Sequence, residues 1–157
     1  MTRCSLFAVL LASVAVVLTA KGTTTRIIVS GPGLLSPIEI VEDVGRFHVW
    51  AGPGTSSKEA QSLIVDWAEG AVELPKALPV YKVSLETTRR DPNTYVVFYT
   101  FDPSTNKGYV FIPGKSHPAY RDNTWLILHG VEGKWFRAWS EWEKLAQPLI
   151  GQASKIR

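Results

Sequence analysis

Apolar residues along this chain occur in short runs that turn residues interrupt about every eight to twelve positions, a spacing typical of antiparallel β proteins. Residues 80–87 alternate between apolar and polar side chains, which predicts a strand with one face in water. Residues 95–101 are apolar on both faces, which predicts a central strand. The turn residues at 102–108 then predict a β-hairpin over residues 94–113.

Shorter runs of the same kind predict further strands, at residues 25–30, 37–41, 63–67, 125–129 and 135–139. Residues 45–50 fit either a strand or one helical turn, and residues 57–62 fit a helical turn. Residues 115–122 are polar and are expected to form a loop.

The period of the apolar positions changes after residue 139, where a helix is expected to begin. Ser140 and Glu143 have the spacing of a capping box, in which the serine hydroxyl accepts a hydrogen bond from the Glu143 amide. Pro148 and Gly151 are expected to limit the helix to about three turns. Its apolar stripe should lie against the sheet and consists of Trp142, Leu145, Ala146 and Leu149.

The predicted fold class is therefore mainly β, within the α+β group. An antiparallel sheet, arranged as a sandwich or a partly open barrel, carries one short C-terminal α-helix packed on it.

The first residues have the pattern of a secretory signal peptide. Arg3 supplies the positive charge, residues 6–18 form the apolar run, and Ala20 ends it with a small residue. The run is too short for a membrane anchor without help from its polar flanks. Residues 1–20 are therefore interpreted as a cleaved leader and residues 21–157 as a single β-rich domain, with no stable membrane span after cleavage. The expected location is the periplasm or the extracellular space.

Composition narrows the function classes. The one cysteine, Cys4, lies in the leader, so no disulfide and no thiol nucleophile is expected in the mature domain. The formal net charge of +3 falls to about +2 when Arg3 is removed, and the remaining cations are dispersed along the chain. Nucleic acid is therefore not an expected partner, since a nucleic-acid groove needs clustered Lys and Arg.

Catalytic patterns are weak, and no cofactor or metal motif is found. Asp66, Asp102 and Glu132 could act as acids or bases, but each lies beside a strand end or turn, where a solvated carboxylate is the simpler interpretation. His48 and His129 lie beside apolar residues of expected strands, and neither has metal-ligand spacing to another histidine.

The best candidate for a binding surface combines the 115–122 loop with the glycine-rich turn after Trp50. Lys115 and Arg121 are cationic, His117 is titratable, and Tyr120 offers a flat amphipathic contact. This set suits an anionic or sugar-like ligand, or an envelope protein. The alternative is that this segment only connects two strands and is a solvated loop without a binding role.

Four segments, at residues 49–54, 64–67, 95–114 and 131–136, look like those of an uncharacterised family of exported bacterial proteins. The resemblance covers most of the mature chain and implies bacterial export. It implies no activity, because none is assigned to that family.

Two functions from different classes remain open. The favoured one is a non-enzymatic binding or cell-envelope interaction domain. The alternative is a small hydrolase or metal-dependent enzyme that uses histidine and carboxylate residues. A fold that brings a histidine and a carboxylate together in one cleft would favour the enzyme.

Overall fold

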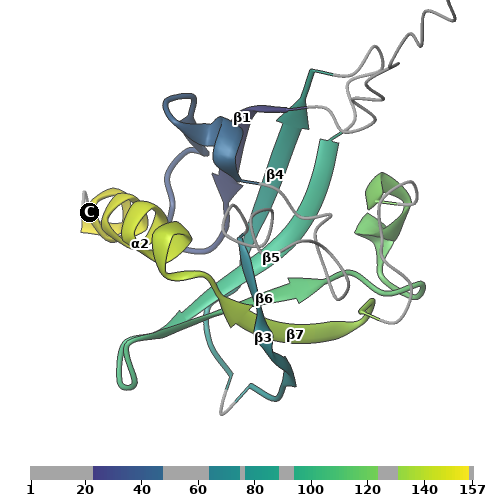
Figure 1. The fold of residues 1–157 in the computed structure, drawn as a ribbon. Coiled ribbons are helices and arrows are strands. Elements are labelled where there is room, and N and C mark those ends of the chain that lie inside the picture. The colour runs from purple at the N-terminus through teal and green to yellow at the C-terminus, as the bar shows by residue number, and fades with distance from the viewer. Residues whose placement is uncertain (1–22, 48–63, 75–76, 89–93, 124–130, 156–157) are drawn as a thin grey trace, which may run out of the picture.

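The structure, a computed structural model, describes residues 23–47, 64–74, 77–88, 94–123 and 131–155. Seven strands in this part of the chain form one open sheet with the order β2-β1-β4-β5-β6-β7-β3, and neighbouring strands are antiparallel (Figure 1). One long helix, α2, packs on the sheet. The predicted antiparallel α+β fold is confirmed, and its sheet is open.

The strands are β1 (Thr24–Ser30), β2 (Ile38–Ile40), β3 (Val65–Val72), β4 (Tyr81–Thr87), β5 (Thr94–Asp102), β6 (Lys107–Ile112) and β7 (Lys134–Ala138). The helical elements are the 3₁₀ turns η1 (Val44–Arg46) and η2 (Pro118–Asn123) and the helix α2 (Ser140–Lys155).

The predicted central hairpin is confirmed by β5 and β6. Their register places Phe98 opposite Phe111 and Asp102 opposite Lys107. Asp102 is 1% exposed, and its carboxylate accepts hydrogen bonds from the Ser104 amide and hydroxyl, so it holds the hairpin turn. β5 is the middle strand and is largely buried on both faces, as its two-sided apolar pattern predicts.

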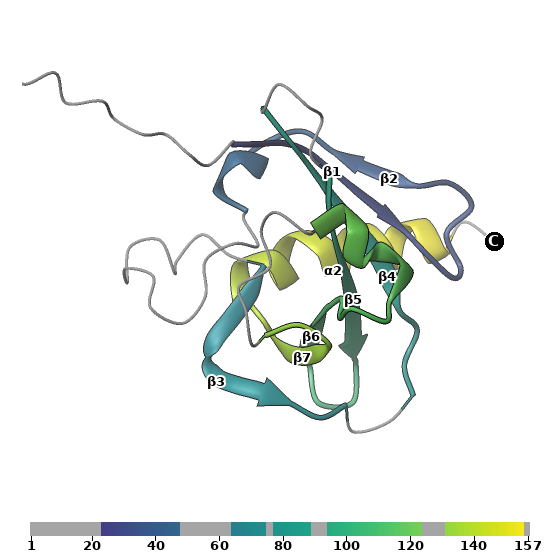
Figure 2. The same cartoon turned by 90° about the vertical axis from the view of Figure 1, so that its right-hand side faces the viewer.

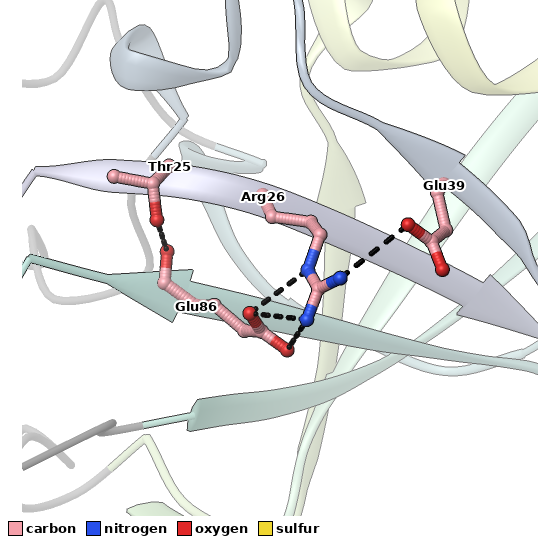
Figure 3. Close-up of polar contacts among 4 residues, drawn as sticks. All are labelled: Thr25, Arg26, Glu39 and Glu86. Carbon is pink, nitrogen blue, oxygen red and sulfur yellow. Dashed lines mark hydrogen bonds and ion pairs between the residues drawn. The ribbon is translucent and has the colours of Figure 1, made fainter.

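One end of the sheet is held by an ion-pair network across three strands (Figure 3). Arg26 in β1 donates from Nε and Nη2 to the two carboxylate oxygens of Glu86 in β4, at 2.9 and 3.0 Å. Its Nη1 reaches Glu39 in β2 at 3.4 Å. The opposite face of β1 belongs to the core, where Ile27 and Val29 are at most 1% exposed.

The other end of the sheet is bulged. β3 lies at this edge and pairs only with β7 among the described residues. The register jumps from Asp66 opposite Arg137 to Ala71 opposite Phe136, so residues 67–70 leave the ladder. Gly70 has a φ of 71°, which a glycine adopts without strain.

The main core lies between α2 and one face of the sheet. The predicted stripe of α2 is confirmed as a packing face, because Trp142 and Ala146 are at most 1% exposed and Leu145 and Leu149 pack against the core. The same stripe continues to Ile150, which is also buried.

Two details of the helix prediction were wrong. The Glu143 amide donates to the carbonyl of Trp139 at 3.0 Å rather than to the Ser140 hydroxyl, so the capping residue lies one position earlier. The helix also runs for 16 residues, about 4.4 turns, through Pro148 and Gly151. Proline removes one backbone donor, but burial of Ala146 and Ile150 on either side of it holds the helix together.

The 115–122 segment also differs from its prediction, since η2 forms a 3₁₀ helix where a loop was expected. α2 and η2 lie on opposite sides of the sheet, and Figure 2 places η2 in front of the strands and α2 behind them. Within residues 23–155, as far as they are described, no helix is long and apolar enough to cross a membrane.

Several predictions lie outside the described residues. These are the leader at 1–20, the helical turn at 57–62 and the strand at 125–129, together with Trp50, His48 and His129.

Candidate functional site

The face of the sheet that carries η2 is built from a row of aromatic rings. Phe98, Phe111 and Trp135 occupy facing positions on β5, β6 and β7. The ring centroids of Phe98 and Phe111 are 6.4 Å apart, and those of Phe111 and Trp135 are 5.2 Å apart. Each ring is only partly buried, so this face can support a second layer.

His117 packs directly on this row. Its ring meets Phe98 edge-on at 4.7 Å and lies 6.0 Å from Phe111. Its Nδ1 accepts a hydrogen bond from the Ala119 amide at 3.1 Å, so the neutral ring carries its proton on Nε2. His117, which was predicted as part of a binding surface, therefore also has a packing role.

Asn123 fixes the other end of η2 to β5. Its side-chain oxygen accepts from the Val96 amide at 2.8 Å, and its side-chain nitrogen donates to the Val96 carbonyl at 2.5 Å. β6 pairs with β5 only from Phe98 onward, so the amide group of Asn123 takes the place of a further strand residue. Asn123 is 4% exposed, and sequence reasoning missed it.

The segment held in this way forms a pocket of about 390 Å³. Its lining residues are Lys115, Ser116, His117, Pro118, Tyr120 and Arg121. Four of the five residues predicted for the binding surface therefore lie together, and the fifth, Trp50, is outside the described residues. Lys115 and Arg121 are exposed, and the lining contains no carboxylate. The pocket consequently combines positive charge with ring surfaces.

A polar cluster lies on the α2 side, where Asp66, Glu69, Arg137 and Glu143 line a hollow of about 380 Å³. Arg137 stacks on Tyr109 with its guanidinium carbon 5.0 Å from the ring centre, and its Nε lies 3.7 Å from Glu69. This arrangement ties β3 to β7.

Two carboxylates of this cluster bind backbone amides. Glu143 accepts a hydrogen bond from the Gly108 amide of β6, and burial raises the pKa of its carboxyl group despite that bond and the nearby Arg137. Asp66 accepts from the Ala68 amide at 2.9 Å, inside the bulge of β3. Both carboxylates thus have structural roles.

The described residues contain no group of three or more His, Cys, Asp or Glu side chains placed to hold a metal ion. The pocket around His117 likewise places no acid beside the imidazole along its described lining.

Comparison with known proteins finds no matching family model, no matching curated protein and no matching solved structure.

Proposed function

We propose that this chain is an exported binding domain without enzymatic activity, and that its ligand occupies the pocket formed by Lys115, His117, Tyr120 and Arg121. Export is proposed from the leader pattern of residues 1–20. The observation that supports binding most is the convergence of these four side chains on one pocket of about 390 Å³.

The chemistry of the pocket favours a sugar that bears an anionic group. Lys115 and Arg121 supply the positive charge, which attracts a carboxylate. Tyr120 and His117 supply ring surfaces against which a pyranose can lie.

Rigidity supports the same proposal. Asn123 clamps η2 to β5 at Val96, and His117 is seated on Phe98. The pocket is therefore formed before a ligand arrives, which reduces the cost of ordering side chains on binding.

The test is titration of the mature protein with D-glucuronate and with D-glucose, followed by amide NMR shifts. Glucuronate is expected to bind more tightly than glucose and to shift the amides of residues 115–122. The Lys115→Ala/Arg121→Ala double variant should weaken glucuronate binding by about tenfold or more.

The matched control is the double variant Lys82→Ala/Lys107→Ala, which removes the same charge from exposed positions on β4 and β6. It should bind as the parent does. Equal weakening in both double variants would mean that binding depends only on the net charge of the protein. Unchanged binding in the Lys115→Ala/Arg121→Ala protein would mean that the ligand binds elsewhere. Either result contradicts the proposal.

A further inference from the structure

A larger hollow lies on the other face of the sheet, beside the C-terminal half of α2. Its volume is about 820 Å³, within the range of small-molecule sites. Leu78 and Pro79 before β4 and Phe101 and Pro103 at the end of β5 form one wall. The helix supplies the other wall.

The described lining of this hollow consists of twelve residues, and none of them is charged. Apolar side chains dominate, and the polar groups are the amides of Gln147 and Gln152 and the hydroxyls of three further residues, Tyr81, Tyr99 and Ser154. A carboxylate or an ammonium group would therefore lose its hydration here without gaining a partner of opposite charge. The lining suits a neutral, mostly apolar ligand.

Tyr99 places a polar group, its hydroxyl, at the inner wall of the hollow. Its side chain is 0% exposed, and its hydroxyl is buried without a hydrogen-bond partner. Buried polar groups are usually hydrogen-bonded, so an acceptor placed at the inner wall would complete the bonding of this hydroxyl. The amide of Gln147, which also lines the hollow, lies near the hydroxyl and lowers the pKa of the phenol, although burial outweighs this effect.

The surroundings also keep the Tyr99 hydroxyl in its donor form. Burial raises the pKa of the phenol, and the negative charge of Glu143, one helical turn before Gln147, raises it further. The same charge disfavours an anionic ligand group at this position.

We infer that this hollow binds a small neutral molecule with an aromatic or short aliphatic body and one hydrogen-bond acceptor, such as a carbonyl oxygen, that is held by Tyr99 and Gln147. The site lies on the opposite face of the sheet from the Lys115 pocket, so it is independent of the function proposed above.

The sequence of α2 allows a sharp test of this site. Gly151 lines the hollow, and a Cβ added to it would meet no atom within 4 Å, so a larger side chain fits at this position without a clash. Replacing glycine inside a helix also raises helix propensity. Gly151→Phe should therefore fill the hollow while the protein stays folded, and Gly151→Ala serves as the control that changes propensity alone.

Three probes of similar shape distinguish the effect of a neutral acceptor, of no acceptor and of a negative charge. They are the ketone 2-acetonaphthone, the hydrocarbon 2-ethylnaphthalene and the anion 2-naphthoate. Titration of the mature protein is followed by amide NMR shifts. The ketone should bind best, with shifts concentrated in residues 146–154 and at the end of β5. The anion should bind with an affinity at least about tenfold lower than that of the ketone.

Two variants complete the test. Gly151→Phe should abolish ketone binding, while Gly151→Ala should keep it. Tyr99→Phe should lower the affinity for the ketone about five- to tenfold and leave the affinity for the hydrocarbon unchanged. The inference is overturned if the ketone fails to bind at millimolar concentration, if the anion is preferred, or if Gly151→Phe binds the ketone as tightly as Gly151→Ala does.

Discussion

The phenol ring of Tyr99 in β5 meets the indole of Trp142 in α2 edge to face, with their centroids 5.8 Å apart and their planes at 88°. Phe47 meets the same indole at 5.6 Å and 78°. Edge-to-face pairs add to the free energy gained from area burial alone. Trp142, which is 0% exposed, thus joins the helix both to the middle strand and to the residue after η1.

Trp142→Ala is expected to lower the free energy of unfolding by about 3 to 5 kcal/mol, because it removes a fully buried ring and leaves a cavity. Urea unfolding followed by circular dichroism measures the loss. Trp135→Ala, at a partly exposed tryptophan, is the comparison and should cost less. A Trp142→Ala protein with the midpoint of the parent would mean that α2 does not belong to the core.

Tyr99→Phe should leave the protein as stable as the parent at neutral pH or more stable by about 1 kcal/mol, since the variant no longer buries an unpartnered hydroxyl.

The same substitution should remove a pH dependence in alkali. The pKa of Tyr99 in the folded state is raised, so above about pH 10 the unfolded chain loses this proton while the folded chain keeps it. Stability of the parent therefore falls as the pH rises above that point, by up to about 1.4 kcal/mol per pH unit, and Tyr99→Phe escapes this contribution. Denaturant unfolding midpoints of both proteins, measured between about pH 9 and 11, test this prediction. A parallel loss of stability in the parent and in Tyr99→Phe would contradict it.

Glu143→Gln and Glu141→Gln, two residues apart on one helix, are expected to respond to pH with opposite signs. Burial raises the pKa of Glu143, so the parent loses stability relative to Glu143→Gln as the pH rises from about 4 toward neutrality. Lys144 lowers the pKa of Glu141, so the parent loses stability relative to Glu141→Gln as the pH falls below the ordinary carboxyl pKa of about 4.

Chemical unfolding of the three proteins at several pH values checks both signs. The glutamine at position 143 keeps an oxygen that can accept from the Gly108 amide, so the difference reports charge rather than a lost hydrogen bond. A Glu143→Gln curve parallel to that of the parent is the result that would contradict the buried environment.

His117→Ala should destabilise the protein by about 1 to 2 kcal/mol, because it removes the edge-on contact with Phe98 and leaves the Ala119 amide without its acceptor. Lys115→Ala/Arg121→Ala should change stability by less than about 1 kcal/mol, since exposed charges contribute little. Thermal unfolding of both proteins gives the comparison, and equal effects would remove the packing role of His117.

The exported protein should begin near Lys21, as the small residue at Ala20 predicts for leader cleavage. Mass spectrometry of the protein recovered outside the cytoplasm measures its first residue. A recovered chain that still begins at Met1 would instead identify residues 1–20 as a retained anchor.

The strands were predictable because a period of two is a local property of the sequence. The alternation in β4 and the two-sided apolar pattern of β5 required no knowledge of the partner strands. The length of α2 was not predictable, since Pro148 and Gly151 are local stop signals and the packing of Ile150 that overrides them is a tertiary effect.

The candidate site was predictable in part for a similar reason. Lys115, His117, Tyr120 and Arg121 are close in the sequence, so any compact turn brings them together. The clamp between Asn123 and Val96 joins residues 27 positions apart, and an asparagine with this role has no distinguishing pattern. The hollow near Tyr99 combines three segments of the chain, and its unpartnered hydroxyl is visible only in three dimensions.

The spatial order of the strands controls when the sheet can form. β1 pairs with β4 more than 50 positions later, as Ile27 opposite Leu85 shows, and β3 needs β7, where Val65 lies opposite Ala138. Among the described strands, β1 and β2 are the only pair in which both partners lie in the first half of the chain, and they pair over three residues. Closing such long loops is slow compared with forming the local β4–β5 and β5–β6 pairs, so β1 joins the sheet only after β4 is available and β3 only after β7 is. Both ends of the sheet are therefore expected to form late, since each depends on a strand that lies far along the chain.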